Sequence, residues 1–199
     1  MRLLRSSILS TGLLFAFASV AVADADWQTI QAAGDPGITI DIPAGVPQET
    51  SVDPSKGELM AFFAASSHGD ETLQCFLNRE AYSETMNRQA WDAALASSKI
   101  SLLCENSGAT ISRYEADSSQ STTSNGYSAA TCVGAYTDSR EKLPGIVTST
   151  LTIAAPDAIY VLTCNAGATD QDEAIAAWMV DWKDSVAHMQ ASLHLAQGK

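Results

Sequence analysis

The sequence predicts an α+β fold: an antiparallel sheet of six or seven strands covered by two long helices in an α/β/α-type sandwich. Two observations predict this class. Three strand-like segments precede one helical segment, and four further strand-like segments precede a second helical segment. Short turns separate the last four strands, which is typical of an antiparallel meander.

Three segments in the first part of the chain have strand patterns. Residues 38–42 alternate apolar and polar side chains, as a half-buried strand does. Residues 58–66 contain the apolar run LMAFFAA and predict a central strand. Residues 72–78 place Leu73, Cys75 and Leu77 on one face.

The chain before these strands is less informative. Residues 27–33 fit strand and helix alike. Asp35-Pro36-Gly37 predicts a turn, because proline presets φ and glycine permits positive φ.

The spacing of apolar residues changes from a strand-like to a helical period in the middle of the chain. Apolar side chains at helical spacing predict a helix over residues 83–98, in which Glu84 and Lys99 suit the two ends of the helix dipole. The turn signals Asn125-Gly126, Leu143-Pro-Gly145 and Pro156-Asp157 then divide a four-stranded meander. Its strands are predicted at residues 110–116, 127–137, 146–154 and 158–164.

The chain is predicted to close with a helix over residues 171–195, which Thr169 or Asp170 caps. One apolar stripe runs along it and predicts its core-facing side. The stripe consists of Ile175, Trp178, Met179, Trp182, Val186, Met189 and Leu193.

The N-terminus predicts export. Residues 1–23 combine two arginines, an apolar run and the small-x-small site Ala21-Val22-Ala23, which together are typical of a cleaved signal peptide. We therefore expect one globular domain at residues 24–199, periplasmic or secreted, without a stable membrane span after cleavage.

The composition is acidic, with a net charge of −12 for the whole chain. Removal of Arg2 and Arg5 with the signal peptide makes the charge more negative still. Such a chain repels nucleic acid, and we expect a soluble monomer.

The four cysteines, Cys75, Cys104, Cys132 and Cys164, predict two structural disulfides in an exported chain. The strand at residues 146–154 separates Cys132 from Cys164, so these two lie about 9–10 Å apart, beyond the reach of a disulfide. If the last meander strand docks beside residues 72–78, Cys75 pairs with Cys164. Cys104 then pairs with Cys132.

Signatures of catalysis and of metal binding are absent from the sequence. It contains no GxSxG, HExxH, phosphate-binding loop or CxxC motif. His188, Met189 and His194 suit copper by residue type, but their spacing does not place them on one face. The loop from Asp53 to Glu58 lacks the carboxylate density of a calcium loop. We therefore predict no catalytic residue, metal or cofactor.

The strand ITIDIPAGV, the central helix, the meander and IYVLTCNAG followed by an amphipathic helix resemble the PsbP-like family over residues 38–189. The resemblance implies a non-catalytic accessory or binding module that engages an envelope protein or a small ligand. The alternative is a periplasmic hydrolase whose carboxylates converge only in the fold. Against it, five acidic residues fall in predicted turns or at strand ends, where solvated carboxylates are ordinary: Asp70, Glu71, Asp117, Asp138 and Glu141. A deep pocket with converging carboxylates or histidines favours the hydrolase, whereas an apolar groove favours the module.

Overall fold

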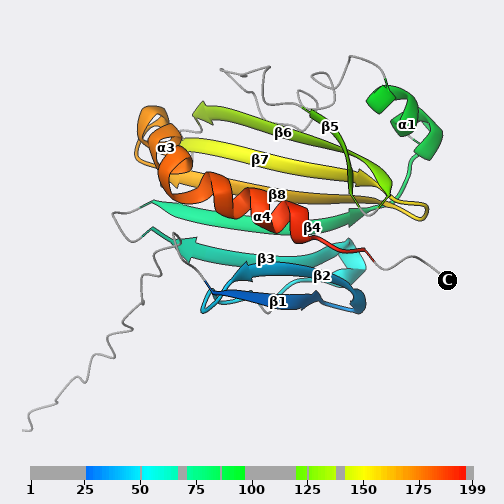
Figure 1. Cartoon of the computed structure of the whole chain (residues 1–199), viewed down its shortest axis with the longest axis horizontal. Helices are drawn as coiled ribbons and strands as arrows, with labels where there is room; N and C mark the ends of the chain where they lie inside the picture. Colours follow the sequence, from blue (N-terminus) through cyan, green and yellow to red (C-terminus); the bar gives the residue numbers. More distant parts are fainter. Residues whose placement is uncertain are drawn as a thin grey trace, which may run out of the picture.

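The computed structural model describes residues 26–49, 51–66, 71–85, 87–96, 120–124, 126–137 and 142–195. Figure 1 shows a large twisted sheet, a two-stranded hairpin beside it and a helical segment that crosses in front of the sheet. Within the described residues, no helix is both long and apolar enough to span a bilayer.

The large sheet has six antiparallel strands in the order β3-β4-β8-β7-β6-β5. The last strand of the meander, β8, docks beside β4, so β3 and β4 of the first predicted group join the meander in one sheet. The strands are β3 (Glu58–Ala65), β4 (Thr72–Glu80), β5 (Gln120–Ser124), β6 (Tyr127–Thr137), β7 (Gly145–Ala154) and β8 (Ile159–Ala168).

The predicted single sheet covered by two long helices is wrong, because β1 (Trp27–Ala32) and β2 (Asp35–Pro43) form a separate two-stranded sheet. Alternation predicts which side chains of β2 are buried, and Ile38, Ile40 and Ile42 are each at most 2% exposed. It does not predict which strands pair. Besides pairing with β1, β2 forms a β-bridge between Thr39 and His194, which lies beyond the last helix.

The turn between β1 and β2 lies before the predicted position. Ala33 and Gly34 form the turn, and Gly34 has a φ of 75°, which favours glycine. Asp35, Pro36 and Gly37 instead open β2, where the pairing with β1 shifts register. Proline is tolerated in a strand at such an irregularity, since a ladder hydrogen bond is already missing there.

The first helix is short. The helix α1 comprises Arg88–Ala96, and the side chain of Asn87 accepts a hydrogen bond from the backbone N–H of Ala90 at 2.9 Å. This capping bond explains why the helix begins later than residue 83. The predicted strand at 110–116 lies outside the described residues, and β5 (Gln120–Ser124) was not among the predicted strands.

The C-terminal helical segment has three parts: α3 (Gln171–Ala177), the π-helical turn η4 (Trp178–Trp182) and α4 (Lys183–Ser192). Of the two predicted caps, Asp170 accepts the backbone N–H of Glu173 at 2.8 Å. The helix ends at Ser192 rather than at residue 195, because the next residues are extended and His194 pairs with Thr39.

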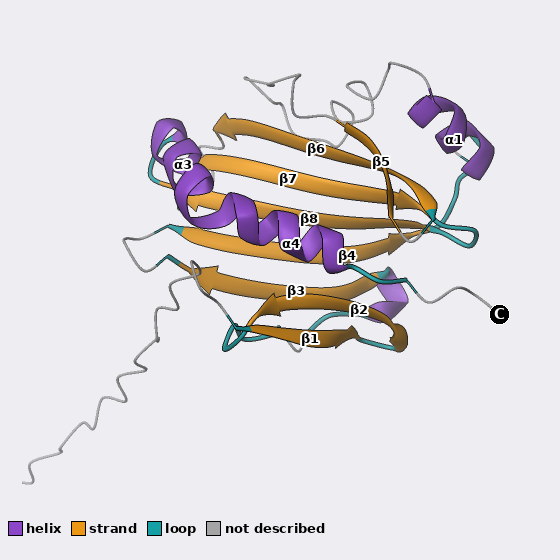
Figure 2. Ribbon diagram, viewed as in Figure 1, coloured by secondary structure: helices purple, strands orange, loops and turns teal. Residues whose placement is uncertain are grey.

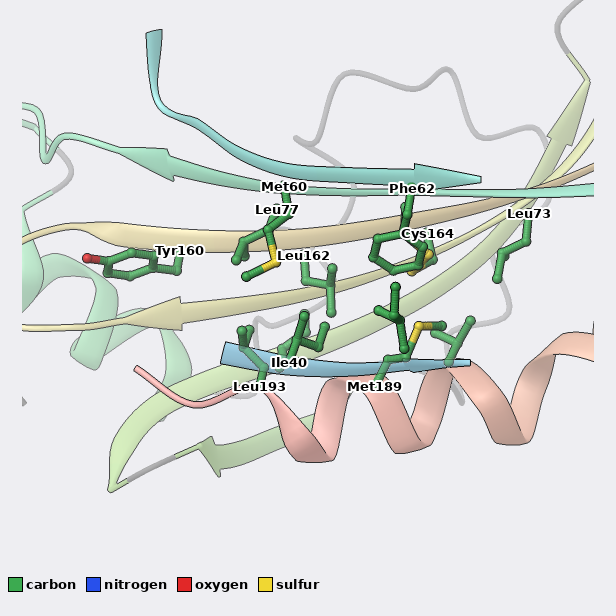
Figure 3. Packing of buried hydrophobic residues seen from close by; sticks show 14 of the residues in the cluster. Ile40, Met60, Phe62, Leu73, Leu77, Tyr160, Leu162, Cys164, Met189 and Leu193 are labelled. Carbon is green, nitrogen blue, oxygen red and sulfur yellow. A yellow bond between two sulfur atoms is a disulfide. The ribbon is translucent and has the colours of Figure 1, made fainter. Parts of the chain in front are cut away.

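The main core lies between one face of the large sheet and a second layer made of β2 and α4. Figure 3 shows Ile40 of β2 and Leu193 beyond α4 on the side opposite Leu162 of β8. Ile40, Leu162 and Leu193 are each at most 1% exposed. Burial of such a side chain stabilises the fold by roughly 1.5–3 kcal/mol, so this layer holds the C-terminal helix in place. Figure 2 shows the same arrangement by secondary structure.

Candidate functional site

An open groove of about 490 Å³ lies between the C-terminal helical segment and the inner face of β6 and β7. It exists because the helical segment and the strands diverge: α3 packs on β6, β7 and β8, whereas α4 packs beside β2. The inner face of β6 is therefore not covered by α4. A volume of this size is within the range of small-molecule sites.

The helical wall of the groove is a row of side chains four residues apart. The row consists of Ile175, Met179, Lys183 and Ala187, and Trp178, Val186 and Gln190 flank it. Residues at this spacing form a ridge that runs obliquely along a helix. One side of the C-terminal segment thus faces the core, while the neighbouring ridge faces the groove.

The π-helical turn explains why Met179 belongs to the groove. The N–H of Lys183 donates to the carbonyl oxygen of Trp178, five residues earlier, so this turn is wider than an α-helical turn. Trp178 and Trp182 remain buried, whereas Met179 is 57% exposed and the neighbouring Val180 is 82% exposed. The prediction that Met179 belongs to the buried stripe is therefore wrong.

The opposite wall consists of short side chains. Thr131, Val133 and Ala135 alternate along the inward face of β6 and line the groove, and Val147 and Ser149 of β7 contribute its floor. Small side chains on an inward strand face leave space that a larger residue fills elsewhere in a core. This run of small inward residues is the sequence signal that could have indicated the groove.

The polar groups of the groove are few. The side-chain amide of Gln190 donates to the Ser149 hydroxyl at 3.0 Å, so the buried serine is satisfied. Lys183 is the one charged lining residue, and the lining contains no carboxylate, imidazole or thiol among the residues described. A few polar groups on an otherwise apolar surface are typical of a site that orients a ligand.

The cysteines lie outside the groove. Cys75 and Cys164 form a disulfide between facing residues of β4 and β8, with their Cα atoms 4.1 Å apart. This is the first of the two pairings that the sequence predicted. Cys132 also takes part in a disulfide. Cys104 lies outside the described residues, and its pairing with Cys132 stays a prediction.

The residues of the copper hypothesis do not meet. Met189 is fully buried in the core, whereas the His188 ring is exposed and stacks on Trp27 with ring centroids 3.8 Å apart. His188 also lies 3.4 Å from the Asp41 carboxylate, which joins α4 to the β1–β2 hairpin. In the described part of the chain, no three His, Cys, Asp or Glu side chains are arranged to hold a metal ion.

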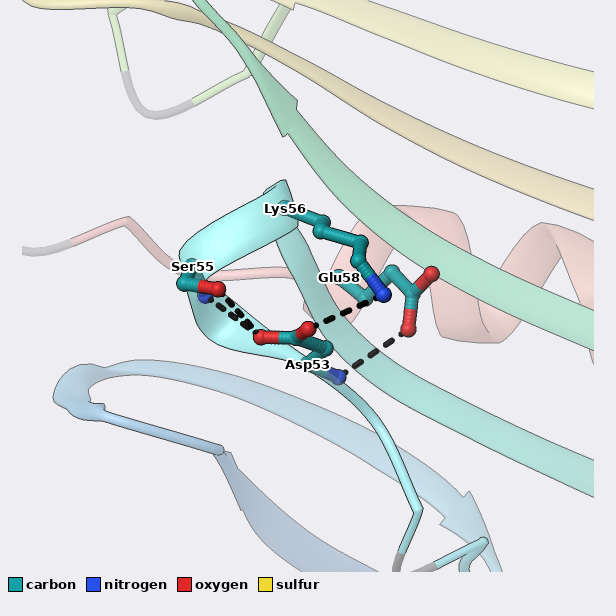
Figure 4. A network of polar contacts seen from close by, with 4 residues as sticks. All are labelled: Asp53, Ser55, Lys56 and Glu58. Carbon is teal, nitrogen blue, oxygen red and sulfur yellow. Dashed lines mark hydrogen bonds and ion pairs between the residues drawn. The ribbon is translucent and has the colours of Figure 1, made fainter.

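The loop before β3 uses its carboxylates to hold its own backbone (Figure 4). Asp53 caps the short helix η2 (Pro54–Lys56): it accepts the Ser55 hydroxyl at 2.6 Å and contacts the Lys56 ammonium at 3.1 Å. These hydrogen bonds lower the pKa of the Asp53 carboxyl. Glu58 accepts the backbone N–H of Asp53 at 3.0 Å. The loop is therefore a structural turn, closed by its own side chains.

Of the five acids predicted in turns or at strand ends, Glu71 alone is described, and it precedes β4. Asp70, Asp117, Asp138 and Glu141 lie outside the described residues. A different acid, Asp157, accepts the Tyr160 hydroxyl at 3.1 Å and pairs with Arg79 at 2.8 Å. Burial, with the nearby Asp157 charge, raises the pKa of Tyr160 to about 12. This cluster keeps a neutral phenol and does not line the groove.

Comparisons with known proteins give similarity in three dimensions only. Searches against protein-family models and curated protein sequences find no match for this chain. Among solved structures, the chain is similar to LpqN, involved in cell envelope biogenesis of Mycobacterium tuberculosis, with 17% identity and a TM-score of 0.46 over 87% of this chain and 93% of that one. It is similar to the Ran-binding protein Mog1p of Saccharomyces cerevisiae, with 17% identity and a TM-score of 0.48 over 87% and 97% of the two chains. It is also similar to the cyanobacterial PsbP of Synechocystis, with 12% identity and a TM-score of 0.46 over 90% and 98%. These values assign the chain to no family, and the resemblance to the PsbP-like family stays a prediction.

Proposed function

We propose that this chain is an exported, non-catalytic binding module that holds a small apolar ligand in the groove between β6 and the C-terminal helical segment. The observation that carries the proposal is the lining of the groove, which is mainly aliphatic and aromatic with few polar groups. Transfer of an apolar ligand from water to such a surface is favourable in proportion to the area buried.

The same lining favours binding over hydrolysis. General acid–base or nucleophilic catalysis needs a carboxylate, imidazole, thiol or activated hydroxyl beside the substrate. The groove offers two hydroxyls, Thr131 and Ser149, and its described lining contains no carboxylate or imidazole; the one basic side chain, Lys183, is hydrogen-bonded to neither hydroxyl. Ser149 is 1% exposed and accepts a hydrogen bond from Gln190, which suits a structural role.

Export is the second part of the proposal. The signal-like residues 1–23 support it, and so does the buried Cys75–Cys164 disulfide, since such bonds persist in oxidising compartments. An intact-mass measurement on protein from the periplasm of its host tests it. We expect a mature chain that begins at Asp24, and a mass that includes residues 1–23 would contradict cleavage.

A neutral apolar dye, Nile red, tests the groove directly. We expect saturable one-to-one binding with enhanced dye fluorescence, and loss of this binding in Ala187→Trp, because the new ring occupies the groove. Ala187 is exposed on α4 and lines the groove, so the substitution leaves the core intact. Ala176→Trp is the matched control, because Ala176 is an exposed helical alanine that does not line the groove.

Two results contradict the proposed site. One is the absence of saturable dye binding to the folded wild-type protein. The other is equal dye binding by both tryptophan variants, which places the dye elsewhere. If the protein binds a purified envelope protein but not the dye, the partner is a protein and the small-ligand proposal is wrong.

A further inference from the structure

The charge distribution around the groove indicates the class of ligand. The chain has 23 acidic and 11 basic residues, so carboxylates outnumber the lysines and arginines with which they could form ion pairs. Lys183, the one charged side chain of the groove lining, nevertheless makes no ion pair with any described residue. Neither Asp181 nor Asp184, its neighbours in the sequence, lines the groove.

The position of Lys183 follows from the π-helical turn. Its backbone N–H closes the wide turn on Trp178, and its side chain stands in the groove-facing row between Met179 and Ala187. Lys183 is exposed, so its side chain reaches solvent while its aliphatic stem covers part of the groove wall. A ligand bound in the groove therefore meets apolar side chains on both walls and one lysine, which stands within the helical row between Met179 and Ala187.

The remaining lining residues suit an aliphatic chain. Ile175, Trp178 and Val186 form the apolar helical side, and Val133, Ala135 and Val147 form the sheet side. A chain that lies between these walls loses its contact with water on both sides. A headgroup with several charges or many hydrogen bonds finds no matching partners there, since the lining has only hydroxyl and amide groups besides Lys183.

We propose that the groove binds a fatty-acid-type ligand, with its alkyl chain between the helical row and β6 and its carboxylate at the Lys183 ammonium. This inference rests on the proposed binding function and specifies its ligand. The apolar walls supply most of the affinity, and the charge pair orients the ligand. An exposed charge pair contributes little binding free energy on its own. The length of the alkyl chain is therefore expected to determine most of the affinity, and the headgroup a smaller part that can be measured separately.

Calorimetric titrations with octanoate, decanoate and dodecanoate, each below its micelle concentration, test the alkyl part. Burial of one methylene changes an equilibrium by about four-fold, so each added pair of methylenes is expected to tighten binding by up to about fifteen-fold until the groove is full. Ala187→Trp is expected to abolish the binding of all three. Ala176→Trp retains it.

Headgroup specificity is tested with decanol, which has the same chain and no charge. We expect wild-type protein to bind decanoate more tightly than decanol, and Lys183→Gln to weaken decanoate by about two- to five-fold without an effect on decanol. Lys142→Gln is the control, because Lys142 is an exposed lysine outside the groove. Decanoate affinity is expected to be unchanged in that variant.

The outcomes separate this inference from the proposed function. If decanol and decanoate bind equally and Lys183→Gln changes neither, the groove is an apolar site without the carboxylate specificity, and the inference is wrong while the binding function stands. If no alkyl ligand binds, or if Ala187→Trp does not block binding, both are wrong.

Discussion

Removal of the Cys75–Cys164 disulfide tests how the fold is stabilised. The double substitution Cys75→Ala and Cys164→Ala opens a link between residues 89 positions apart. In the chain-entropy treatment, a closed loop of this length costs the unfolded chain about 4.6 kcal/mol at 25 °C. Both sulfurs are fully buried, so their loss adds a small packing cost, whereas structure retained in the unfolded chain reduces the entropic gain. We expect a loss of about 2–5 kcal/mol in the free energy of unfolding.

Urea unfolding followed by circular dichroism and tryptophan fluorescence measures this loss. If the disulfide acts mainly on the unfolded chain, its removal also raises the m-value, because the unlinked chain exposes more surface on unfolding. Ile153→Val is the packing control: it removes one carbon from a fully buried side chain and is expected to cost about 0.5–1.5 kcal/mol without a change in m.

A loss below about 1 kcal/mol in the double variant would refute the entropic reasoning. A larger loss with an unchanged m-value would instead assign the effect to packing around the two sulfurs. Peptide mapping without reduction checks the remaining pair, for which we expect Cys104–Cys132.

Three further substitutions test individual contacts. Asp170→Ala is expected to lower the free energy of unfolding by about 1 kcal/mol, because the first turn of α3 loses its side-chain cap; chemical denaturation measures it. Gly145→Ala is expected to cost roughly 3 kcal/mol, because a Cβ there lies 1.8 Å from the carbonyl oxygen of Asp170, whereas Gly167→Ala, with its nearest atom at 3.4 Å, is the mild control. Tyr160→Phe is expected to remove one phenol that ionises near pH 12 from the ultraviolet titration. Since folding raises the pKa of this phenol, its contribution to stability is complete below about pH 10 and disappears as the pH rises to about 12, so the variant has a flatter stability profile in that window.

Local pattern was sufficient for much of the large sheet. The alternation in residues 72–78 predicted that Leu73, Cys75 and Leu77 share one face, and all three are buried. The short turns predicted that β6, β7 and β8 are neighbours, as they are in the sheet. The docking of β8 beside β4 was a conditional prediction, and the observed register places Cys75 directly opposite Cys164. These features follow from the two-residue period of a strand and from short connections, both of which are properties of neighbouring residues.

The features that make the candidate site depend on contacts between distant residues. The alternating pattern predicted that Ile40 is buried. It did not predict that β2 pairs with β1 alone and lies beside α4, because this arrangement depends on packing over the face of the large sheet. The seven-residue apolar stripe fitted an uninterrupted α-helix, because hydrophobic periodicity carries no signal for the wide turn that moves Met179 out of the core. The groove in turn exists because that helix diverges from β6. The sequence thus specified which faces are apolar, while the crossing of helix and sheet, a property of the packed layers, determined where an apolar face stays open to a ligand.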